Sequence, residues 1–172
     1  TILRYPPGNY ATKLCVLYEK VFLRYDKTRI QTTGESAMNQ AERRLYLIHT
    51  LLSERPSCRR QEIPKDAARQ RVLLRGLMNV RPAKQISPEF LSVQDEYLRQ
   101  ELSEAGVTHV EDLQPVSGEL YLWQGDITKL SCGAIVNAAN SGLTGCYVPN
   151  HACIDNCIHT YAGVQLRLDC AE

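Results

Sequence analysis

Two stretches in the first half of the chain place apolar residues at every third or fourth position, which is the spacing of an amphipathic helix. The first stretch covers residues 41–54 and carries a leucine-rich stripe, and Pro56 after it cannot continue a helix. The second runs from about residue 65 to 79, and Pro82 follows soon after its end. We therefore predict two short helices joined by a proline-bearing turn.

A third helix is predicted by its end signals as well as by its periodicity. Ser87 has the side chain of an N-cap, Pro88 fits the first helical position, and Gly106 follows the last apolar position. The three helices together predict a small helical module, which we assign to residues 37–117. The segment before it, residues 1–36, is assigned as an N-terminal extension.

The extension contains a spaced apolar pattern of its own. Apolar residues three or four apart predict a short helix around residues 13–25. Nothing in these residues indicates a function, so we expect the extension to pack on the body of the chain or to fray.

Beyond the helical module the pattern changes to short apolar runs. Residues 120–123 predict a strand, and the continuous run 134–136 predicts a strand that is covered on both faces. The small and polar residues 137–142 then predict a loop at the carboxyl end of that strand. This is the edge at which open α/β sheets bind ligands.

Helical spacing returns over residues 151–163 and again over 164–170, so both segments are expected to be helices. Strands followed by helices predict an α/β fold for this part of the chain. We assign residues 118–172 to a second domain.

Composition and charge exclude some classes of function. The chain has 172 residues, of which 44% are hydrophobic and 23% charged, and its formal net charge is only +1. Arginine is frequent over the predicted helices, but acidic residues are interleaved with it, as on a solvated helix face. No apolar run approaches the roughly 18 residues that a membrane span needs. We therefore expect no nucleic-acid partner and no membrane contact.

Cysteine usage bears on the cellular compartment. The chain has 7 cysteines, whereas the cysteines of a secreted disulfide framework are mostly even in number and lie in a shorter chain. The first residues also lack the basic start and the apolar stretch of a secretory signal. These features favour a reducing, intracellular and cytoplasmic location, with thiols that are free or bound to metal.

Cys146, His151 and Cys153 form a closely spaced group of side chains that bind metals. Thiolate and imidazole suit zinc, and three protein ligands with an open fourth position are typical of a catalytic zinc site. Glycine and proline residues around the group supply bends that let such ligands converge. Because the spacing matches no standard zinc finger, a coincidental set of buried thiols is the alternative.

Two residues that follow leave the coordination open. Cys157 lies one helical turn after Cys153, and if it bound the ion the site would be closed and structural. Alternatively Cys157, like Cys170, is a buried apolar residue. His159 is more consistent with a hydrogen-bonded histidine that packs its helix than with a ligand.

Residues 125–163 contain several motifs in a fixed order. They are Gly125-Asp126-Ile127-Thr128, Ala134-Ile135-Val136-Asn137-Ala138-Ala139-Asn140, Ile154-Asp155-Asn156-Cys157-Ile158-His159 and Ala162-Gly163. In this order and spacing they resemble the opening part of a macrodomain, the ADP-ribose-binding fold. The stretch from Gly145 to Cys153 resembles the zinc-containing branch, where it replaces a glycine-rich loop. The helical module resembles the N-terminal extension of that branch, so the resemblance covers about residues 37–170.

The resemblance implies both a fold and an activity. The fold is a macrodomain-like three-layer α/β/α sheet, incomplete at its C-terminus, with residues 118–172 as a partial macrodomain. The activity is hydrolysis of ADP-ribose from modified proteins, with ADP-ribosylated protein and ADP-ribose as partners. One Zn2+ per chain on Cys146, His151 and Cys153 would orient or polarise the distal ribose, or lower the pKa of a bound water.

The resemblance also implies roles for single residues. Asp126 would accept a hydrogen bond from the adenine amino group, with the backbone of Ile127 beside it. Asn140 would bind the distal ribose and Asp155 would act near the scissile bond, so these two are the expected catalytic residues. Each role has an alternative, because Asp126 can cap a turn, Asp155 can cap a helix and Asn137 can brace the loop.

The resemblance ends before the family's second phosphate-binding loop, which would follow Cys170. The part from Glu119 onward is shorter than the ~100–150 residues that a complete domain of this kind needs. We therefore expect a truncated chain that is weak or inactive as a hydrolase. The alternative functions are an ADP-ribose reader with a structural zinc and no turnover, or a fragment without a pocket.

Overall fold

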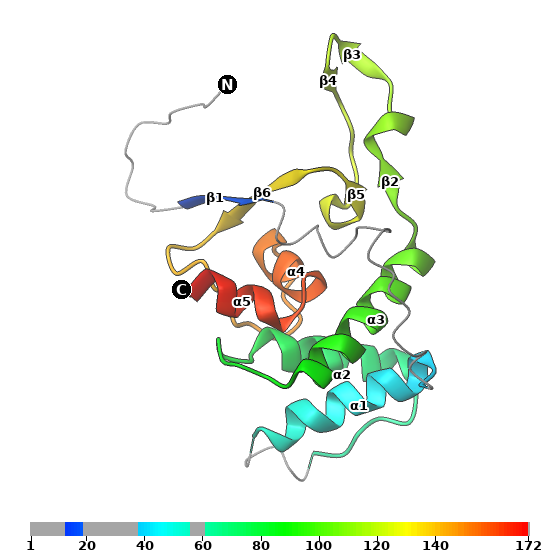
Figure 1. Cartoon of the computed structure of the whole chain (residues 1–172), viewed down its shortest axis with the longest axis vertical. Helices are drawn as coiled ribbons and strands as arrows, with labels where there is room; N and C mark the ends of the chain where they lie inside the picture. Colours follow the sequence, from blue (N-terminus) through cyan, green and yellow to red (C-terminus); the bar gives the residue numbers. More distant parts are fainter. Residues whose placement is uncertain (1–12, 19–37, 56–60, 172) are drawn as a thin grey trace.

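The computed structural model describes residues 38–55 and 61–171, together with the backbone of residues 13–18 (Figure 1). Its helices are α1 (Gln40–Ser53), α2 (Ala67–Asn79), α3 (Pro88–Ala105), α4 (Ile154–Tyr161) and α5 (Val164–Ala171), with 3-10 turns η4 (Val110–Asp112) and η5 (Ile127–Lys129). Its strands are β1 (Lys13–Tyr18), β2 (Thr108–His109), β3 (Pro115–Ser117), β4 (Leu120–Tyr121), β5 (Leu130–Ser131) and β6 (Ala134–Ala139).

The helices α1, α2 and α3 lie where the apolar periodicity predicts them, and each begins at a side-chain cap. α1 begins with a capping box at Asn39, and Asp66 caps α2. Ser87 caps α3, with Pro88 in its first turn and Gly106 at its C-cap. Gly106 has a φ of 82°, a left-handed value that glycine adopts without strain. The predicted end signals of the third helix are confirmed.

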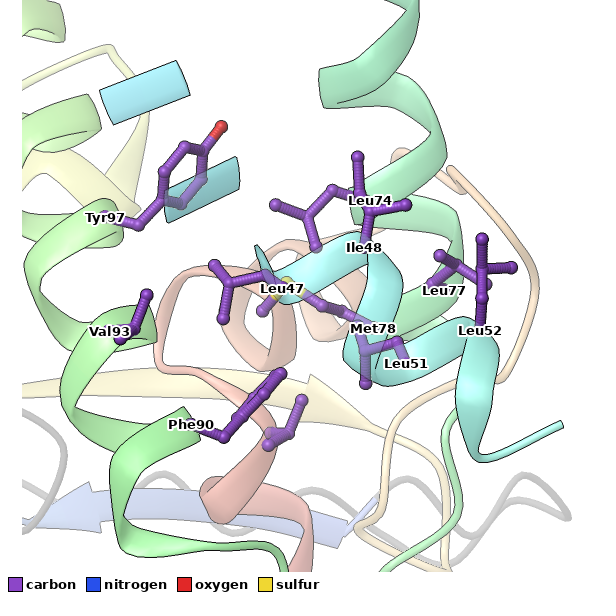
Figure 2. Packing of buried hydrophobic residues seen from close by; sticks show 11 residues of the cluster. Leu47, Ile48, Leu51, Leu52, Leu74, Leu77, Met78, Phe90, Val93 and Tyr97 are labelled. Carbon is purple, nitrogen blue, oxygen red and sulfur yellow. The ribbon is translucent and has the colours of Figure 1, made fainter. Parts of the chain in front are cut away.

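These three helices enclose the main hydrophobic cluster, which we call the helical core (Figure 2). Its buried residues are Leu47, Ile48, Leu51, Leu52, Leu74, Leu77, Met78, Phe90, Val93, Tyr97 and Val164. Phe90 is 0% exposed, and burial of such a side chain stabilises the fold by about 1.5–3 kcal/mol. Val164 comes from α5, so the predicted module 37–117 shares its core with the predicted domain 118–172. The boundary between them stays a prediction.

β1 occupies part of the segment for which a helix around residues 13–25 was expected, and that expectation is wrong for residues 13–18. β1 pairs antiparallel with β6, from Lys13 opposite Ala139 to Tyr18 opposite Ala134. Pairing with a neighbouring strand satisfies the backbone polar groups that a helix would satisfy internally, and such contacts override a weak local pattern. Residues 19–25 lie outside the described part of the chain.

β6 is longer than expected, and only one of its two faces is buried. It continues to Ala139, so the predicted loop begins at Asn140 instead of Asn137. Ile135 is buried whereas Val136 is 50% exposed, and this alternation continues along the strand. The expectation of a strand covered on both faces is therefore wrong, because a continuous apolar run does not reveal which side chains face solvent.

The covered face of β6 packs on α4 and α5. Ile135, Ile158 and Leu166 form a second, smaller cluster there, with Cys170 partly buried against it. α4 contacts both β6 and α2, and so joins the β1–β6 pair to the helical core (Figure 1). α4 lies within the segment 151–163 predicted as a helix, and α5 ends one residue beyond the predicted segment 164–170.

The strands of the described residues form three two-stranded sheets. β1–β6 and β3–β4 are antiparallel, and β2–β5 is parallel. The strand predicted at 120–123 is present as the shorter β4. The chain thus mixes helices and sheets, which is compatible with an α/β fold. None of the helices in the described residues is long and apolar enough to cross a membrane.

Candidate functional site

The loop between β6 and α4 brings Cys146, His151 and Cys153 together. Their ligand atoms all lie within 4.8 Å of one another, and Sγ of Cys146 is 3.5 Å from Nδ1 of His151. The two cysteines are half-buried whereas His151 is exposed, so the group is open to solvent on its imidazole side. The three side chains therefore form a group that can hold a metal ion, and we call these three residues the metal-binding group.

The backbone of this loop takes left-handed turns at several positions. Tyr147 and Asn150 have φ values of 53° and 57°, which cost free energy in residues other than glycine. Gly145 has a φ of 86°, and a Cβ built there would lie 2.8 Å from a guanidinium nitrogen of Arg167. The loop needs glycine at this position both for its conformation and for the close approach of Arg167.

Cys153 has a second role as the N-cap of α4. Its Sγ accepts a hydrogen bond from the backbone N–H of Asn156 at 3.4 Å. Cysteine is not among the usual caps, and the sequence analysis did not find this role. The helix N-terminus favours a thiolate here. Burial and the neighbouring Cys146 nevertheless raise the pKa of the Cys153 thiol.

Cys146 ionises more readily than its neighbour. Burial raises the pKa of its thiol, but hydrogen bonds from the backbone of Val148 and the side chain of Asn156 outweigh burial and lower that pKa. A hydrogen bond donated to sulfur favours the charged form. The environment of Cys146 therefore favours the thiolate, which is the form that binds a metal.

Asp155 is 3% exposed and lies in the first turn of α4. Its Oδ1 accepts a hydrogen bond from Nδ2 of Asn137 at 2.9 Å, which ties α4 to β6. Its Oδ1 also lies 3.5 Å from Nε2 of His159. The cap of α4 is Cys153, so the capping alternative for Asp155 is wrong. Asn137 braces Asp155 and α4 instead of the loop.

His159 packs its helix, as expected, and is not part of the metal-binding group. The side chain is buried, and its Nε2 lies 3.2 Å from the carbonyl oxygen of Leu143. Burial lowers the pKa of His159, and this effect outweighs the opposing charge of Asp155. The imidazole is therefore neutral in the folded chain near pH 7.

Asn140 lies at the start of the loop with an exposed side chain. Its Nδ2 donates to the carbonyl oxygen of Gly145 at 3.0 Å, and its Oδ1 accepts from the N–H of Gly142 at 2.9 Å. Both ends of the amide are thus used to shape the turn that leads to Cys146.

Asp126 and Ile127 are not part of the metal-binding group. Oδ1 of Asp126 accepts hydrogen bonds from the backbone N–H and the hydroxyl of Thr128, at 3.0 and 2.6 Å. Asp126 thus caps η5, the alternative role considered for it. It also lines a hollow of about 210 Å³ whose other residues are Leu98, Glu101, Leu102, Ala105, Thr128, Lys129, Ile135, Ile158, Tyr161 and Ala162.

The metal-binding group lies at the N-terminal end of α4, and the hollow lies beside its C-terminal half. Cys153 caps the first turn of this helix, and Tyr161, its last residue, lines the hollow. α4 has 8 residues, which at 1.5 Å per residue gives a length of about 12 Å.

The α2 helix contributes contacts to the loop that the sequence analysis missed. Arg75 Nη2 donates to the carbonyl oxygen of His151 at 2.8 Å. Asn79 is 1% exposed, and its Oδ1 accepts from the N–H of Asn150 at 2.9 Å. A Cβ added at Gly76 would lie 3.1 Å from Nδ2 of Asn150. A glycine within a helix was the available signal, because it often marks a close approach.

Arg167 of α5 fixes the other end of the loop. Its guanidinium donates to the carbonyl oxygens of Thr144, Met78 and Arg81, and lies 4.3 Å from the centre of the Tyr147 ring. Burial lowers the pKa of Arg167, but an arginine remains charged. This buried cation joins the loop to the end of α2.

Comparison with known proteins gives the chain its relatives. No family model matches it. It is 56% identical over 138 residues to the protein-ADP-ribose hydrolase of Treponema medium, and 48% identical over 139 residues to that of Staphylococcus aureus strain Mu50. These alignments cover 78% and 80% of this chain, and 53% and 52% of the two relatives.

A more distant relative carries a compound name. The chain is 38% identical over 118 residues to a probable bifunctional ADP-ribose hydrolase/ADP-ribosyltransferase of Fusarium oxysporum f. sp. cubense. That alignment covers 62% of this chain and 20% of the relative. The chain spans about half the length of the two bacterial relatives described above. It is a homologue of the aligned half of these proteins, which are named protein-ADP-ribose hydrolase.

Proposed function

We propose that the chain carries the metal site and part of the ligand site of a hydrolase that removes ADP-ribose from modified proteins. The observation that carries the proposal is the solvent-open group of Cys146, His151 and Cys153, in a chain about half identical to proteins of that name. The proposal includes the macrodomain-like three-layer architecture and one Zn2+ per chain.

The donor set of the group fits zinc. Two sulfur atoms and one imidazole nitrogen lie within 4.8 Å of one another, and three ligands leave a fourth position for substrate or water. A bound zinc ion would supply a Lewis acid for the distal ribose or a water of lowered pKa. Cys157 is not among the side chains whose ligand atoms converge, and its thiol lies 3.5 Å from Nη2 of Arg75. This supports an open site over a closed, structural one.

The remaining site residues take the roles that the family resemblance implies. Asn140 shapes the turn before Cys146 and binds the distal ribose next to it. Asp155 acts near the scissile bond, and Asn137 fixes its Oδ1. Asp126 accepts a hydrogen bond from the adenine amino group, with the backbone of Ile127 beside it. The exposed carboxylate of Asp126 supports this role, because both bonds to Thr128 use Oδ1.

The arrangement along α4 suits an elongated ligand. The metal-binding group lies at the N-terminal end of this helix, which is about 12 Å long, and the Asp126 hollow lies beside its C-terminal half. ADP-ribose has a base at one end and a ribose at the other, with a diphosphate between them. The adenine end would lie at Asp126 and the distal ribose at the metal-binding group.

Turnover of an ADP-ribosylated protein tests the proposal. We expect release of ADP-ribose, slow for this chain alone, that stops with a zinc chelator and returns when Zn2+ is added. Activity that persists in the chelator would remove zinc from the reaction. Absence of both turnover and a heat of ADP-ribose binding would contradict the proposed function.

The variant Cys146→Ala separates a hydrolase from a reader with a structural zinc. A hydrolase loses turnover while its far-ultraviolet circular dichroism spectrum and its melting curve change little. A reader with structural zinc loses its folded structure together with ADP-ribose binding. The first outcome supports the proposal and the second replaces it with the reader.

A further inference from the structure

We propose that Asn156 of α4 positions the two cysteine sulfurs of the metal-binding group, and that Arg75 of α2 fixes the orientation of Asn156. Both are positioning residues, because they contact the ligand side chains or the loop and not the reacting atoms. The inference rests on the proposed function in one respect, that the group of Cys146, His151 and Cys153 binds zinc.

Asn156 contacts both sulfur atoms of the group. Its side-chain Nδ2 lies 3.4 Å from Sγ of Cys146, and its backbone N–H donates to Sγ of Cys153 at 3.4 Å. The same Nδ2 donates to the carbonyl oxygen of Val148 at 3.0 Å, inside the loop. One residue thus places a donor on each of the two sulfur atoms and also bonds to the loop that connects them.

The orientation of the Asn156 amide is set by its surroundings. Its NH2 group faces two acceptors, the sulfur of Cys146 and the carbonyl of Val148, while its Oδ1 faces the guanidinium of Arg75 at 3.2 Å. A reversed amide would bring oxygen against two acceptors and NH2 against a cation. Asn156 is 1% exposed, so water cannot compensate for such a reversal.

Arg75 links this arrangement to a different part of the fold. Its Nη2 bonds to Oδ1 of Asn156, to the carbonyl oxygen of His151 at 2.8 Å, and to Sγ of Cys157 at 3.5 Å. A charged donor makes stronger hydrogen bonds than a neutral one. α2 therefore reaches the metal-binding group through the amide of Asn156 and through the backbone of His151.

Residues that orient metal ligands change affinity when they are removed. Loss of such a partner typically weakens metal binding ~10–100-fold. Hydrogen bonds to a thiolate also withdraw charge from sulfur, so their loss raises the energy of the sulfur electrons. In a cobalt-substituted site this shifts the sulfur-to-cobalt charge-transfer band to lower energy, a change that a general loosening of the fold does not produce.

The test measures Zn2+ affinity by competition with a chromophoric chelator, and the absorption spectrum of the Co2+-loaded chain. Asn156→Ala is expected to weaken Zn2+ binding ~10–100-fold and to shift the charge-transfer band to longer wavelength. Arg75→Met is expected to weaken Zn2+ binding about 10-fold, and Arg75→Lys less. The loss of Zn2+ affinity caused by Arg75→Met should be smaller in the N156A background, because part of the effect of Arg75 acts through Asn156.

Arg71→Met is the matched control. Arg71 lies one turn earlier on α2 and pairs with Glu101 at 3.2 Å, away from the loop, so its loss should leave both readouts unchanged. If Asn156→Ala unfolds the chain, the folded Arg75→Lys and Arg75→Met variants give the same two readouts.

The outcomes separate this inference from the proposed function. A wild-type chain that binds neither Zn2+ nor Co2+ refutes the metal site itself. Normal binding with unchanged affinity and spectrum in folded Asn156→Ala refutes the role of Asn156. An equal loss of Zn2+ affinity from Arg75→Met in both backgrounds refutes the action of Arg75 through Asn156. An Arg71→Met variant with the same losses as Arg75→Met refutes it as well.

Discussion

The helices α1–α3 and the strand segment, residues 108–131, differ in what their apolar side chains touch. The helical core buries leucine, phenylalanine and tyrosine from three helices and a valine from α5. In the strand segment, by contrast, Val116, Leu120 and Leu122 are 64%, 67% and 83% exposed. Apolar burial drives folding, so the helical core stabilises this chain far more than the strand segment does.

The loop with the metal-binding group depends on the first of these regions. Its hydrogen bonds reach α2 through Arg75 and Asn79, and α5 through Arg167. A solvent-open loop with left-handed residues is thus fixed by hydrogen bonds from its well-packed side. The loop should therefore keep its conformation as long as the helical core stays folded.

The strongest test of the contrast between the helical core and the strand segment is a pair of alanine substitutions, one in each region. Phe90→Ala should lower the free energy of unfolding by about 3–5 kcal/mol, because it leaves a cavity in the helical core. Leu122→Ala should change it by less than about 0.5 kcal/mol, since this side chain is 83% exposed. Denaturant titration followed by circular dichroism measures both. Equal losses would show that Leu122 is covered in solution and that the contrast is false.

Arg167→Met addresses the link between the core and the loop. The variant leaves the carbonyl oxygens of Thr144, Met78 and Arg81 without their buried donor, so we expect a loss of about 2–3 kcal/mol. Hydrogen exchange in residues 140–153 should quicken more than in the strand segment. Arg69→Met, at an 82% exposed side chain, is the control and should cost less than about 0.5 kcal/mol. Loop exchange that stays slow in Arg167→Met would contradict this link.

A smaller loss of unfolding free energy is expected when the pH is lowered. It is measured on the metal-free chain in the presence of a chelator. The pKa of His159 is lowered by burial in the folded chain, despite Asp155, while that of the unfolded chain is about 6.5. The unfolded state therefore binds more protons below about pH 6.5, and stability is lost as the pH falls through that value toward the folded pKa.

His159→Gln should remove this part of the pH dependence. Between pH 7 and 5.5 the wild type should lose more of its unfolding free energy than the variant, because only the wild type carries the histidine whose pKa is lowered on folding. Asp155 and Arg167, the charged groups that act on His159, are present in both chains. If the unfolding free energies of the two chains changed with pH in parallel, His159 would bind its proton equally well in the folded and the unfolded chain.

Local signals in the sequence sufficed for the helices. The periodicity of α1, α2 and α3, and the Ser87 and Gly106 end signals, depend on residues close together in the chain. The same holds for the convergence of Cys146, His151 and Cys153, which lie within one loop. Patterns of this range are readable without tertiary structure.

The missed features depend on contacts between distant segments. β1 is a strand because β6 lies beside it, and nothing within residues 13–18 reveals that partner. Arg75 reaches Asn156 across 81 positions, and Arg167 reaches Met78 across 89. An arginine on a polar helix face gives the same local pattern whether it pairs with solvent or with a loop. The roles proposed for Asn140, Asp155, Asp126 and Ile127 stay predictions.

The double role of Cys153 has a thermodynamic consequence. The same sulfur begins α4 and belongs to the metal-binding group, so an ion bound there would be linked to the folding of that helix. An ion present at about 100 times its Kd would stabilise the folded chain by about 2.7 kcal/mol, comparable to the expected contribution of Arg167. Metal supply would then set how much of the protein survives heat or proteolysis, apart from any effect on catalysis.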